Sequence, residues 1–444
     1  MHDRRNRRSS QFQVTLLSAC FILACVVSCT EKSSTDSPPR MPAEVPTAAG
    51  TNSPPKNETD REVKPSAGES APREPELLSR EEIESGWVRL FDGRTLFGWK
   101  PNSDTKWNVE HGTITADGKT PGLLMTTFEL ANYELRCDYR LQAGGNSGLF
   151  LRSDFAPSDP ARDCYEFNMC DTHPEFPTGS LVGRKKVESA IKGDGEWHSL
   201  HITLDGPKVA AQFDGQPLID YEDTSGSPRT IGHIGLQANG GRIEFRNIAL
   251  RPLGANAIFN GKDLSGWREV PGSKSVFEAV DGSIHVTDGR GFLETEQTYA
   301  NFVLQTDART NGKHLNSGIF FRALAGTEEA PSHGYEYQIH NGYGDDDRSK
   351  PIDQGTGAIF RRASARWVVA DDNDWFTMTL IANGPHFATW VNGHQVVDWT
   401  DTRPDHENPR KGRRLKAGHL SLQGHDPTTN LDFRNLRIAE LGGS

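Results

Sequence analysis

Three polar side chains suited to proton transfer fall at alternate positions of one short stretch. Residues 334–340 read GYEYQIH, so Glu336, Gln338 and His340 are separated by large apolar or aromatic side chains. If this stretch is a β-strand, the three share one face, because successive side chains of a strand point to opposite sides. A carboxylate or a neutral imidazole can act as a general base, and an amide can stabilise an oxygen that gains charge. The row is therefore a candidate catalytic site.

A matching row lies 170 residues earlier, since Tyr165-Glu166 corresponds to Tyr335-Glu336 (335 − 165 = 170). His173 follows this earlier row, so the catalytic candidates are Glu166 and His173 as well as Glu336 and His340. Other polar side chains on neighbouring predicted strands are candidates for substrate binding: Asn146, Arg152, Asp171 and Gln237 in the first copy, and Asn316, Arg322, Gln338, Gln423 and His425 in the second. Such groups supply fixed donors and acceptors for sugar hydroxyls. We expect them to converge on one sheet face.

Some of these residues have a structural alternative. Arg152 with Glu166, and Arg322 with Glu336, could form buried ion pairs, which are costly to break whatever the function. Asn146 and Asn316 each precede Ser-Gly and could cap a turn.

The two rows have also diverged, so either copy could be the active one. The second copy has His340 and His425 near Glu336, which favours it. The first copy keeps His173.

The rows belong to a duplication of a whole domain. Phe91-Asp92-Gly93 returns as Phe259-Asn260-Gly261, an offset of 259 − 91 = 168, and residues 245–247 return as 433–435, an offset of 188. Landmarks keep their order while the offset grows slowly, as expected when insertions fall in loops. A unit near 170 residues has the size of a domain. We therefore predict two copies, at 86–253 and 255–441.

Each copy alternates with period two. In 133–141, YELRCDYRL, apolar or aromatic residues take every second position, which is typical of a half-buried strand. Asp214-Gly215 and Asn392-Gly393 each separate two apolar runs, a strong hairpin signal. No amphipathic helical run of useful length occurs outside residues 77–83. The fold class predicted is all-β, with each copy a two-sheet antiparallel sandwich of jelly-roll type.

Five motifs in the same order in both copies carry a resemblance to a known family. They are Phe-Asp/Asn-Gly followed by Gly-Trp, Asn-Ser-Gly, Tyr-Glu, Thr-Gly and Phe-Arg-Asn. The chain resembles the 3-keto-disaccharide hydrolase family, formerly a domain of unknown function. The resemblance implies two tandem concanavalin/laminin-G-like sandwiches and cleavage of glycosidic bonds in 3-keto sugars. A C3 ketone acidifies the C2 proton, so a base could remove that proton and expel the group on C1, with water adding afterwards.

The N-terminus is predicted to be a lipoprotein signal peptide, residues 1–28, with four arginines before an apolar run that is short for a membrane span. Cys29 is then the lipidated residue, although Cys20 and Cys25 also fit the signal, and an uncleaved anchor or a plain secretory signal remains the alternative. Residues 29–80, rich in Ser, Thr, Pro and Glu, are predicted to be a disordered linker. We expect a protein of the cell envelope, lipid-anchored, with its domains outside the cytoplasm.

Composition narrows the partners. The net charge is −11 and no basic stripe occurs in the repeats, which argues against nucleic acid. No cofactor is certain. A divalent metal is possible, at Asp345 to Asp347 for example, where a solvated loop is the simpler interpretation. Cys137 and Cys164 could form a disulfide, or two or three of the cysteines of the first copy, which also has Cys170, could be buried free thiols. A non-catalytic glycan-binding module and an adhesion scaffold are the rival functions.

Overall fold

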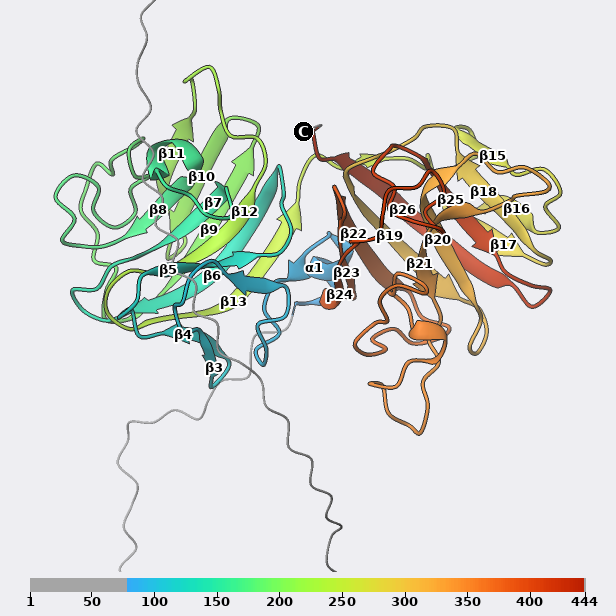
Figure 1. Ribbon diagram of the computed structural model, residues 1–444, viewed down its shortest axis with the longest axis horizontal. Helices are drawn as coiled ribbons and strands as arrows, with labels where there is room; N and C mark the ends of the chain where they lie inside the picture. The colour runs from blue at the N-terminus through green and yellow to red at the C-terminus, as the bar shows by residue number, and fades with distance from the viewer. Residues whose placement is uncertain (1–77, 443–444) are drawn as a thin grey trace, which may run out of the picture. The chain divides into compact units, whose positions relative to one another are not determined.

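The structure, a computed structural model, describes residues 78–442, and its strands form four sheets in two sandwich domains (Figure 1). The predicted signal peptide, its Cys29 and residues 29–77 of the predicted linker lie outside the described residues. No helix within 78–442 has the length and apolar character needed to cross a membrane.

The first domain pairs an eight-stranded sheet with a five-stranded sheet. The larger sheet has the order β11-β10-β9-β6-β13-β4-β3, with β1 on β13, and the smaller has the order β2-β5-β12-β7-β8. The strands of the larger sheet are β1 (Val88–Arg89), β3 (Asn108–Glu110), β4 (Thr113–Ala116), β6 (Tyr133–Leu141), β9 (Trp197–Asp205), β10 (Lys208–Phe213), β11 (Gln216–Glu222) and β13 (Ile243–Pro252). Those of the smaller are β2 (Trp99–Pro101), β5 (Gly122–Thr126), β7 (Ser147–Ser153), β8 (Tyr165–Met169) and β12 (His233–Ala238).

The second domain repeats this order strand for strand. Its larger sheet is β16-β17-β26-β19-β22-β23-β24, with β14 on β26, and its smaller sheet is β15-β18-β25-β20-β21. The larger sheet contains β14 (Asn256–Ala257), β16 (Val276–Val280), β17 (Ser283–Thr287), β19 (Phe302–Thr310), β22 (Phe376–Asn383), β23 (His386–Val391), β24 (His394–Thr400) and β26 (Asn430–Glu440). The smaller contains β15 (Trp267–Glu269), β18 (Gly291–Thr295), β20 (Ser317–Leu324), β21 (His333–Ile339) and β25 (His419–Gly424).

Helices are few and short in the described chain: α1 (Arg80–Glu84), α2 (Pro160–Asp163) and the 3-10 turn η1 (Ile352–Gln354). Helix α1 overlaps the short stretch that the sequence singled out and ends one residue beyond it, and Ser79 with Glu82 forms a capping box at its start. The all-β prediction is confirmed.

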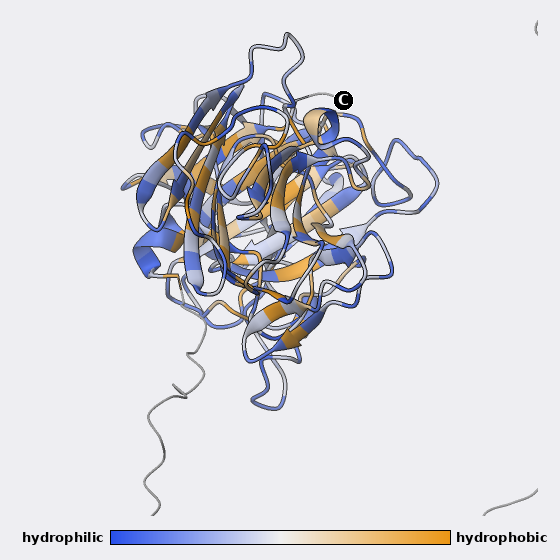
Figure 2. Cartoon of the chain, turned by 90° about the vertical axis from the view of Figure 1, so that its left-hand side faces the viewer, coloured by the Kyte–Doolittle hydropathy of each residue, from blue (hydrophilic) through white to orange (hydrophobic). Residues whose placement is uncertain are grey.

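Local sequence explains the register of the sheets. In β6, burial alternates along the strand as the period-two pattern predicts, with Tyr133, Leu135 and Tyr139 in the core. The hairpins β10–β11 and β23–β24 turn at Asp-Gly and Asn-Gly pairs whose residues all have φ between 45° and 75°. Asp, Asn and Gly adopt this left-handed conformation at the least cost. Figure 2 shows apolar residues gathered on the strands and hydrophilic ones in the loops.

The three cysteines of the first domain, Cys137, Cys164 and Cys170, are free and buried in the described structure. The interpretation as buried thiols is therefore the one that the structure supports.

A bulge in each smaller sheet overturns one expectation. Pairing of β20 shifts register between Phe320 and Ala323, and Arg322 inside the bulge has a φ of 46°. Arg152 in β7 has a φ of 45° in the same setting. Because an extra residue in a bulge changes the side to which the following side chains point, strict alternation fails there. The prediction that Arg152 and Arg322 share the outer face with the polar rows is wrong.

Candidate functional site

The polar row of the second domain lies on the outer face of its five-stranded sheet. Cross-strand pairs share a face, and Phe320 pairs with both Glu336 and Ser421, while Gly318 pairs with Gln338. The opposite face of β21 carries Tyr335, Tyr337 and Ile339 into the core between the sheets. The alternation of β21 thus places Glu336 and Gln338 side by side above a floor that includes Phe320.

Glu336 lines a cavity of about 70 Å³ together with Phe360, Arg361 and Arg410. Its Oε2 lies 3.9 Å from Arg410 Nη2. Burial raises the pKa of the Glu336 carboxyl, and the charges of Arg410 and His425 oppose that rise. A carboxylate whose pKa is raised towards neutrality is a stronger base than an exposed one, so Glu336 is suited to remove a proton.

A chain of hydrogen-bonding groups continues from Gln338. Its Nε2 donates to Asn316 Oδ1 at 3.2 Å, and Asn316 Nδ2 donates to Asp353 Oδ2, also at 3.2 Å. The same Asp353 oxygen lies 3.8 Å from His340 Nε2. Asn316 and Gln338 are therefore brought together as predicted from the sequence, and Asp353 is an additional member that the strand pattern did not indicate.

His340 is held as a neutral donor at this end of the row. Its Nδ1 accepts a hydrogen bond from the Gly342 N–H at 3.2 Å, which places the ring proton of the neutral form on Nε2. Burial lowers the pKa of His340, while Asp353 opposes the change. With Nδ1 occupied and Nε2 protonated, His340 is suited to donate a hydrogen bond, and Glu336 is the better base.

Three buried polar atoms on this face have no hydrogen-bond partner within the described residues: Gln338 Oε1, Ser421 Oγ and Gln423 Oε1. Buried polar groups without partners are rare in proteins. Their position on one face beside Glu336 indicates that a polar ligand or ordered water completes them. Gly318 keeps the space open, since a Cβ there would lie 3.1 Å from Glu336 Cγ.

A second cavity, of about 230 Å³, lies on the same sheet face and includes Arg290 and Phe292 in its lining. Phe292 on β18 packs edge-to-face on Phe320, with ring centroids 5.5 Å apart. The floor of the face is thus aromatic, with polar groups around it. Of the other predicted residues, Gln423 pairs with Phe292 on this floor, and His425 lies at the rim, bonded to Asp426.

The equivalent face of the first domain is more apolar. Glu166 is buried there, and its surroundings include a small apolar cluster: Leu123, Met125, Phe150 and Cys164. Burial raises the pKa of Glu166 to about 7, with the Gln237 amide opposing the rise. Gln237 therefore lies beside Glu166, as expected.

Two of the remaining first-copy candidates, Asp171 and His173, make hydrogen bonds within a loop. His173 Nδ1 accepts from the Phe176 N–H at 2.9 Å, and Asp171 accepts from Thr178 and from the Gly193 N–H, so both hold a loop in place. Asn146 makes backbone hydrogen bonds with Gly240 and Asn239. The two rows therefore differ in what surrounds their glutamates.

Arg322 is fully buried and donates to the carbonyl oxygens of Ala300, Gly384 and Arg414 at 2.7–2.9 Å. Arg152 makes the equivalent bonds to Ala131, Gly206 and Arg229. Neither forms an ion pair with the glutamate of its copy among the described residues. Both arginines hold loops in place by donating hydrogen bonds to backbone carbonyl oxygens. Because both side chains are fully buried, they cannot contact a substrate as predicted.

The raised pKa of Glu166 gives a stability prediction. The carboxyl stays protonated in the folded state up to about pH 7 but ionises near 4.5 in the unfolded chain, so folding stability falls as pH rises from 4.5 to 7. The shift of about 2.5 pH units corresponds to ~3 kcal/mol. Glu166→Gln has no carboxyl to titrate and is expected to remove this loss. The free energy of unfolding, measured with urea, should therefore fall less between pH 4 and pH 8 in the variant than in the parent, by up to that amount. An unchanged difference between the two pH values would contradict the burial of a titrating carboxyl.

Comparison with known proteins gives the family. Residues 86–251 and 254–439 each match the domain described as 3-keto-alpha-glucoside-1,2-lyase-like, and the two matches together cover most of the chain. The chain belongs to this family. A curated relative, the 3-keto-disaccharide hydrolase of Bacteroides thetaiotaomicron, is 23% identical over 228 residues, which cover 38% of this chain and 79% of the relative. The protein is thus a glycosyl hydrolase-like, carbohydrate-active member of the 3-keto-alpha-glucoside-1,2-lyase-like family.

Solved structures with a similar fold each span about one domain. A candidate glycosyl hydrolase from Parabacteroides distasonis is 22% identical, with a TM-score of 0.37, and covers 41% of this chain and 100% of its own. A carbohydrate-binding module from Bacillus subtilis is 17% identical, with a TM-score of 0.28, and covers 35% of this chain and 95% of its own.

Proposed function

We propose that this member of the 3-keto-alpha-glucoside-1,2-lyase-like family cleaves glycosidic bonds of 3-keto sugars on the outer face of the second domain's smaller sheet. The observation that carries the proposal is a buried glutamate of raised pKa beside three unpartnered buried polar atoms. A base and unpaired hydrogen-bonding groups over an aromatic floor suit a sugar ring. The family membership supports the type of bond.

The proposed reaction has two steps. Glu336 takes the C2 proton, the electron pair forms a C1–C2 double bond, and the C1–O bond breaks, so that the leaving group departs as an alcohol after protonation. Water then adds across the double bond and gives the free 3-keto sugar. Gln338 and His340 are proposed as hydrogen-bond donors to the oxygen that gains charge when the proton leaves.

The experiment is direct. The purified chain is incubated with a panel of 3-keto disaccharides, with and without an added divalent cation, and released sugars are measured. We expect sugars to be released from a 3-keto disaccharide when the protein is present and not when it is omitted. Sugar binding without release from any 3-keto glycoside would instead identify a glycan-binding module, and the absence of both would favour a scaffold. The cation arm tests a metal requirement, since no cluster of three metal-ligating side chains occurs in residues 78–442.

We further propose that the protein acts at the cell envelope, anchored by lipid on Cys29. The four arginines, the short apolar run and the cysteine that follows it support this. Cys29→Ser is expected to move the protein from the membrane fraction to the soluble one when a cell lysate is fractionated. An unchanged distribution, with Cys20→Ser or Cys25→Ser causing the shift, would place the anchor at the other site.

A further inference from the structure

Three arginines lie near Glu336, and within residues 78–442 the only carboxylate paired with any of them is Glu336 itself. Arg410 approaches Glu336 at 3.9 Å, while Arg290 and Arg361 are exposed and make no ion pair with any carboxylate within residues 78–442. All three are close enough to Glu336 for their charges to act on its carboxyl. Three positive charges beside one acid leave a net positive charge on this face, which attracts an anion.

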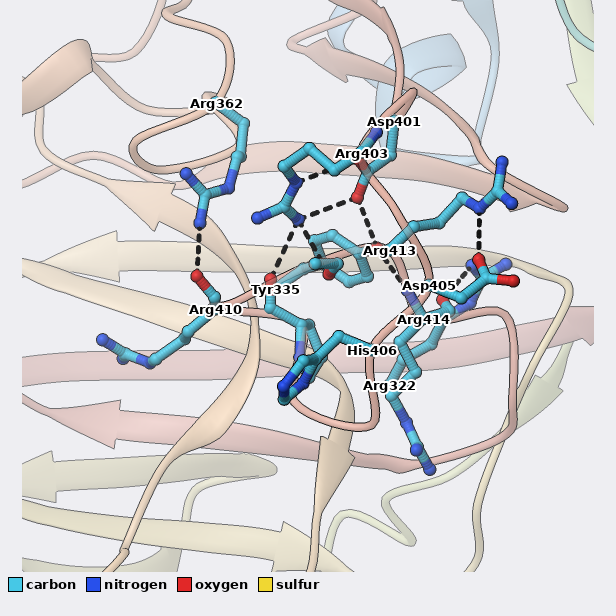
Figure 3. Close-up of polar contacts among 12 residues, drawn as sticks. Arg322, Tyr335, Arg362, Asp401, Arg403, Asp405, His406, Arg410, Arg413 and Arg414 are labelled. Carbon is cyan, nitrogen blue, oxygen red and sulfur yellow. Dashed lines mark hydrogen bonds and ion pairs between the residues drawn. The ribbon is translucent and has the colours of Figure 1, made fainter.

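Neighbouring arginines in the same loop as Arg410 each form an ion pair with a carboxylate of that loop. Arg403 bonds to Asp401 at 2.8 Å, Arg413 to Asp405 at 2.6 Å, and Arg414 to Glu407 at 2.7 Å. Figure 3 shows the Arg410 side chain directed away from Asp401 and Asp405, while its carbonyl accepts from Arg362. The paired arginines hold the loop, and Arg410 is left to face the cavity.

The first domain serves as an internal comparison, because the two smaller sheets have the same strand order. Gly122 and Gly291 begin equivalent strands, so Pro121 stands where the second domain has Arg290. The turn after Leu181 is closed by its bridge to Lys185, and the turn after Ile359 by its bridge to Ala363. Gly183 in the first domain is therefore at the position equivalent to Arg361 in the second.

Arg410 also has no counterpart in the first domain. The tyrosines Tyr165 and Tyr335 each bond an aspartate, Asp223 or Asp401, and accept from a backbone N–H, that of Arg229 or Arg414. Arg229 follows Asp223 by 229 − 223 = 6 residues in the first domain, whereas Arg414 follows Asp401 by 414 − 401 = 13 residues in the second. Arg410 lies in the longer segment. None of the three arginines therefore has an equivalent in the first copy.

The surroundings favour a ligand that carries its charge on a ring-like body. Arg410 lies over the Phe320 ring, 5.3 Å from its centroid, and Phe292 continues the apolar floor towards the larger cavity that Arg290 lines. The cavity at Glu336, of about 70 Å³, has room for about two water molecules, at about 30 Å³ each, or for one charged substituent. Guanidinium groups bind carboxylates and sulfates through paired N–H donors.

We propose that the second domain binds an anionic saccharide on this face, with a carboxylate or sulfate substituent held by Arg361 and Arg410 at the Glu336 cavity, and with Arg290 adding positive charge from the neighbouring cavity. The inference rests on the proposed function for the sugar body, and it adds the charge class of the substrate. Attraction of polyanions by the whole molecule does not account for such binding, because the net charge of the chain is −11.

The test measures binding by calorimetry on the full chain, at low and at high salt. The probes are trigalacturonate, a sulfated disaccharide, and a neutral galacto-oligosaccharide of the same length as the first. We expect at least one anionic probe to bind ~10-fold or more tightly than the neutral one, with an advantage that shrinks as salt rises. The uronate and sulfate arms decide which substituent is preferred.

The variants are matched to the first domain. Arg361→Gly introduces the first-domain residue at a position whose φ of 60° glycine adopts easily, so the fold should be retained. Combined with Arg290→Gln and Arg410→Gln, it is expected to abolish the preference for the anionic probe, a loss of roughly 10-fold or more. Arg94→Gln, a change of an exposed arginine in the first domain, is the control for loss of one positive charge, compared with Arg290→Gln alone, and should leave the preference intact.

The outcomes separate this inference from the proposed reaction. Equal binding of acidic and neutral probes, or an equal loss in Arg94→Gln, overturns the anion site whether or not 3-keto sugars are cleaved. Selective anion binding that the triple variant removes supports it even if no 3-keto disaccharide is turned over, in which case only the proposed reaction fails.

Discussion

Replacing Glu336 by Gln is expected to lower kcat for a 3-keto disaccharide by roughly 10²- to 10⁴-fold, the usual contribution of a general base. Gln keeps the size and the hydrogen-bonding capacity of the side chain but cannot accept the C2 proton. Because the carboxyl is buried and its pKa is raised, the activity of the parent should increase with pH above the ordinary carboxyl range and then level off. Initial rates across pH, with sugar affinity measured separately, check both statements.

Two comparisons make the result specific. Glu336→Asp retains a base at a longer reach and should keep part of the activity that Gln loses, since positioning alone is then impaired. Glu166→Gln makes the same change in the first domain. If that variant loses turnover and Glu336→Gln does not, the first domain is the active copy and the assignment made above is wrong.

His340 separates the roles further. With its Nδ1 accepting from Gly342, it is assigned as a donor, so His340→Gln should keep more activity than His340→Ala. A base at this position would lose activity equally in both variants.

Much of the fold and of the candidate site could be predicted from the alternation of apolar and polar residues along the strands. The face shared by Glu336 and Gln338, the hairpins at Asp-Gly and Asn-Gly pairs and the duplicated domain were all predictable, because each depends on local pattern or on comparison of the copies. The same comparison could have found Arg410, since the segment between Asp401 and Arg414 is longer than its counterpart. Length differences between copies mark insertions, and loops commonly carry function.

Other features depend on contacts that sequence spacing does not encode. Asp353 reaches the row from η1, in a loop more than ten residues beyond β21, with a φ of 47° that strand alternation says nothing about. The proton position on His340 depends on the backbone of Gly342. These contacts are set by how a loop folds back over the sheet, which is a property of tertiary packing.

The arginines show where alternation itself fails. Counting by twos from Asn316 places Arg322 on the outer face, yet the bulge before Ala323 turns it inwards, and the same holds for Arg152. A bulge is an extra residue in one strand, and nothing in the motif Ser-Gly-Ile-Phe-Phe-Arg distinguishes it from a regular strand. In both copies the motif ends at a buried arginine that donates hydrogen bonds to backbone carbonyl oxygens.

The buried arginine of the second domain gives the second large prediction. Arg322→Met is expected to destabilise the second domain by about 3–5 kcal/mol, because it leaves three buried carbonyl oxygens without donors, at roughly 1–3 kcal/mol each with partial rescue by water. Burial lowers the pKa of Arg322 to about 10, so the side chain remains charged at neutral pH. The loss should therefore be similar from pH 6 to pH 8, measured as the shift of the urea midpoint.

Arg410→Met is the matched control for this prediction. It removes an arginine of the same domain whose side chain is 41% exposed and whose nearest carboxylate is 3.9 Å away, so its effect on stability should stay below about 1 kcal/mol. Arg322→Lys should lie between the two, since an ammonium group offers one centre where the guanidinium spans several carbonyls. If Arg322→Met and Arg410→Met prove equally mild, the carbonyls around Arg322 must be satisfied by water, and the conserved spacing of the arginine in the two copies would need a role at the ligand face after all.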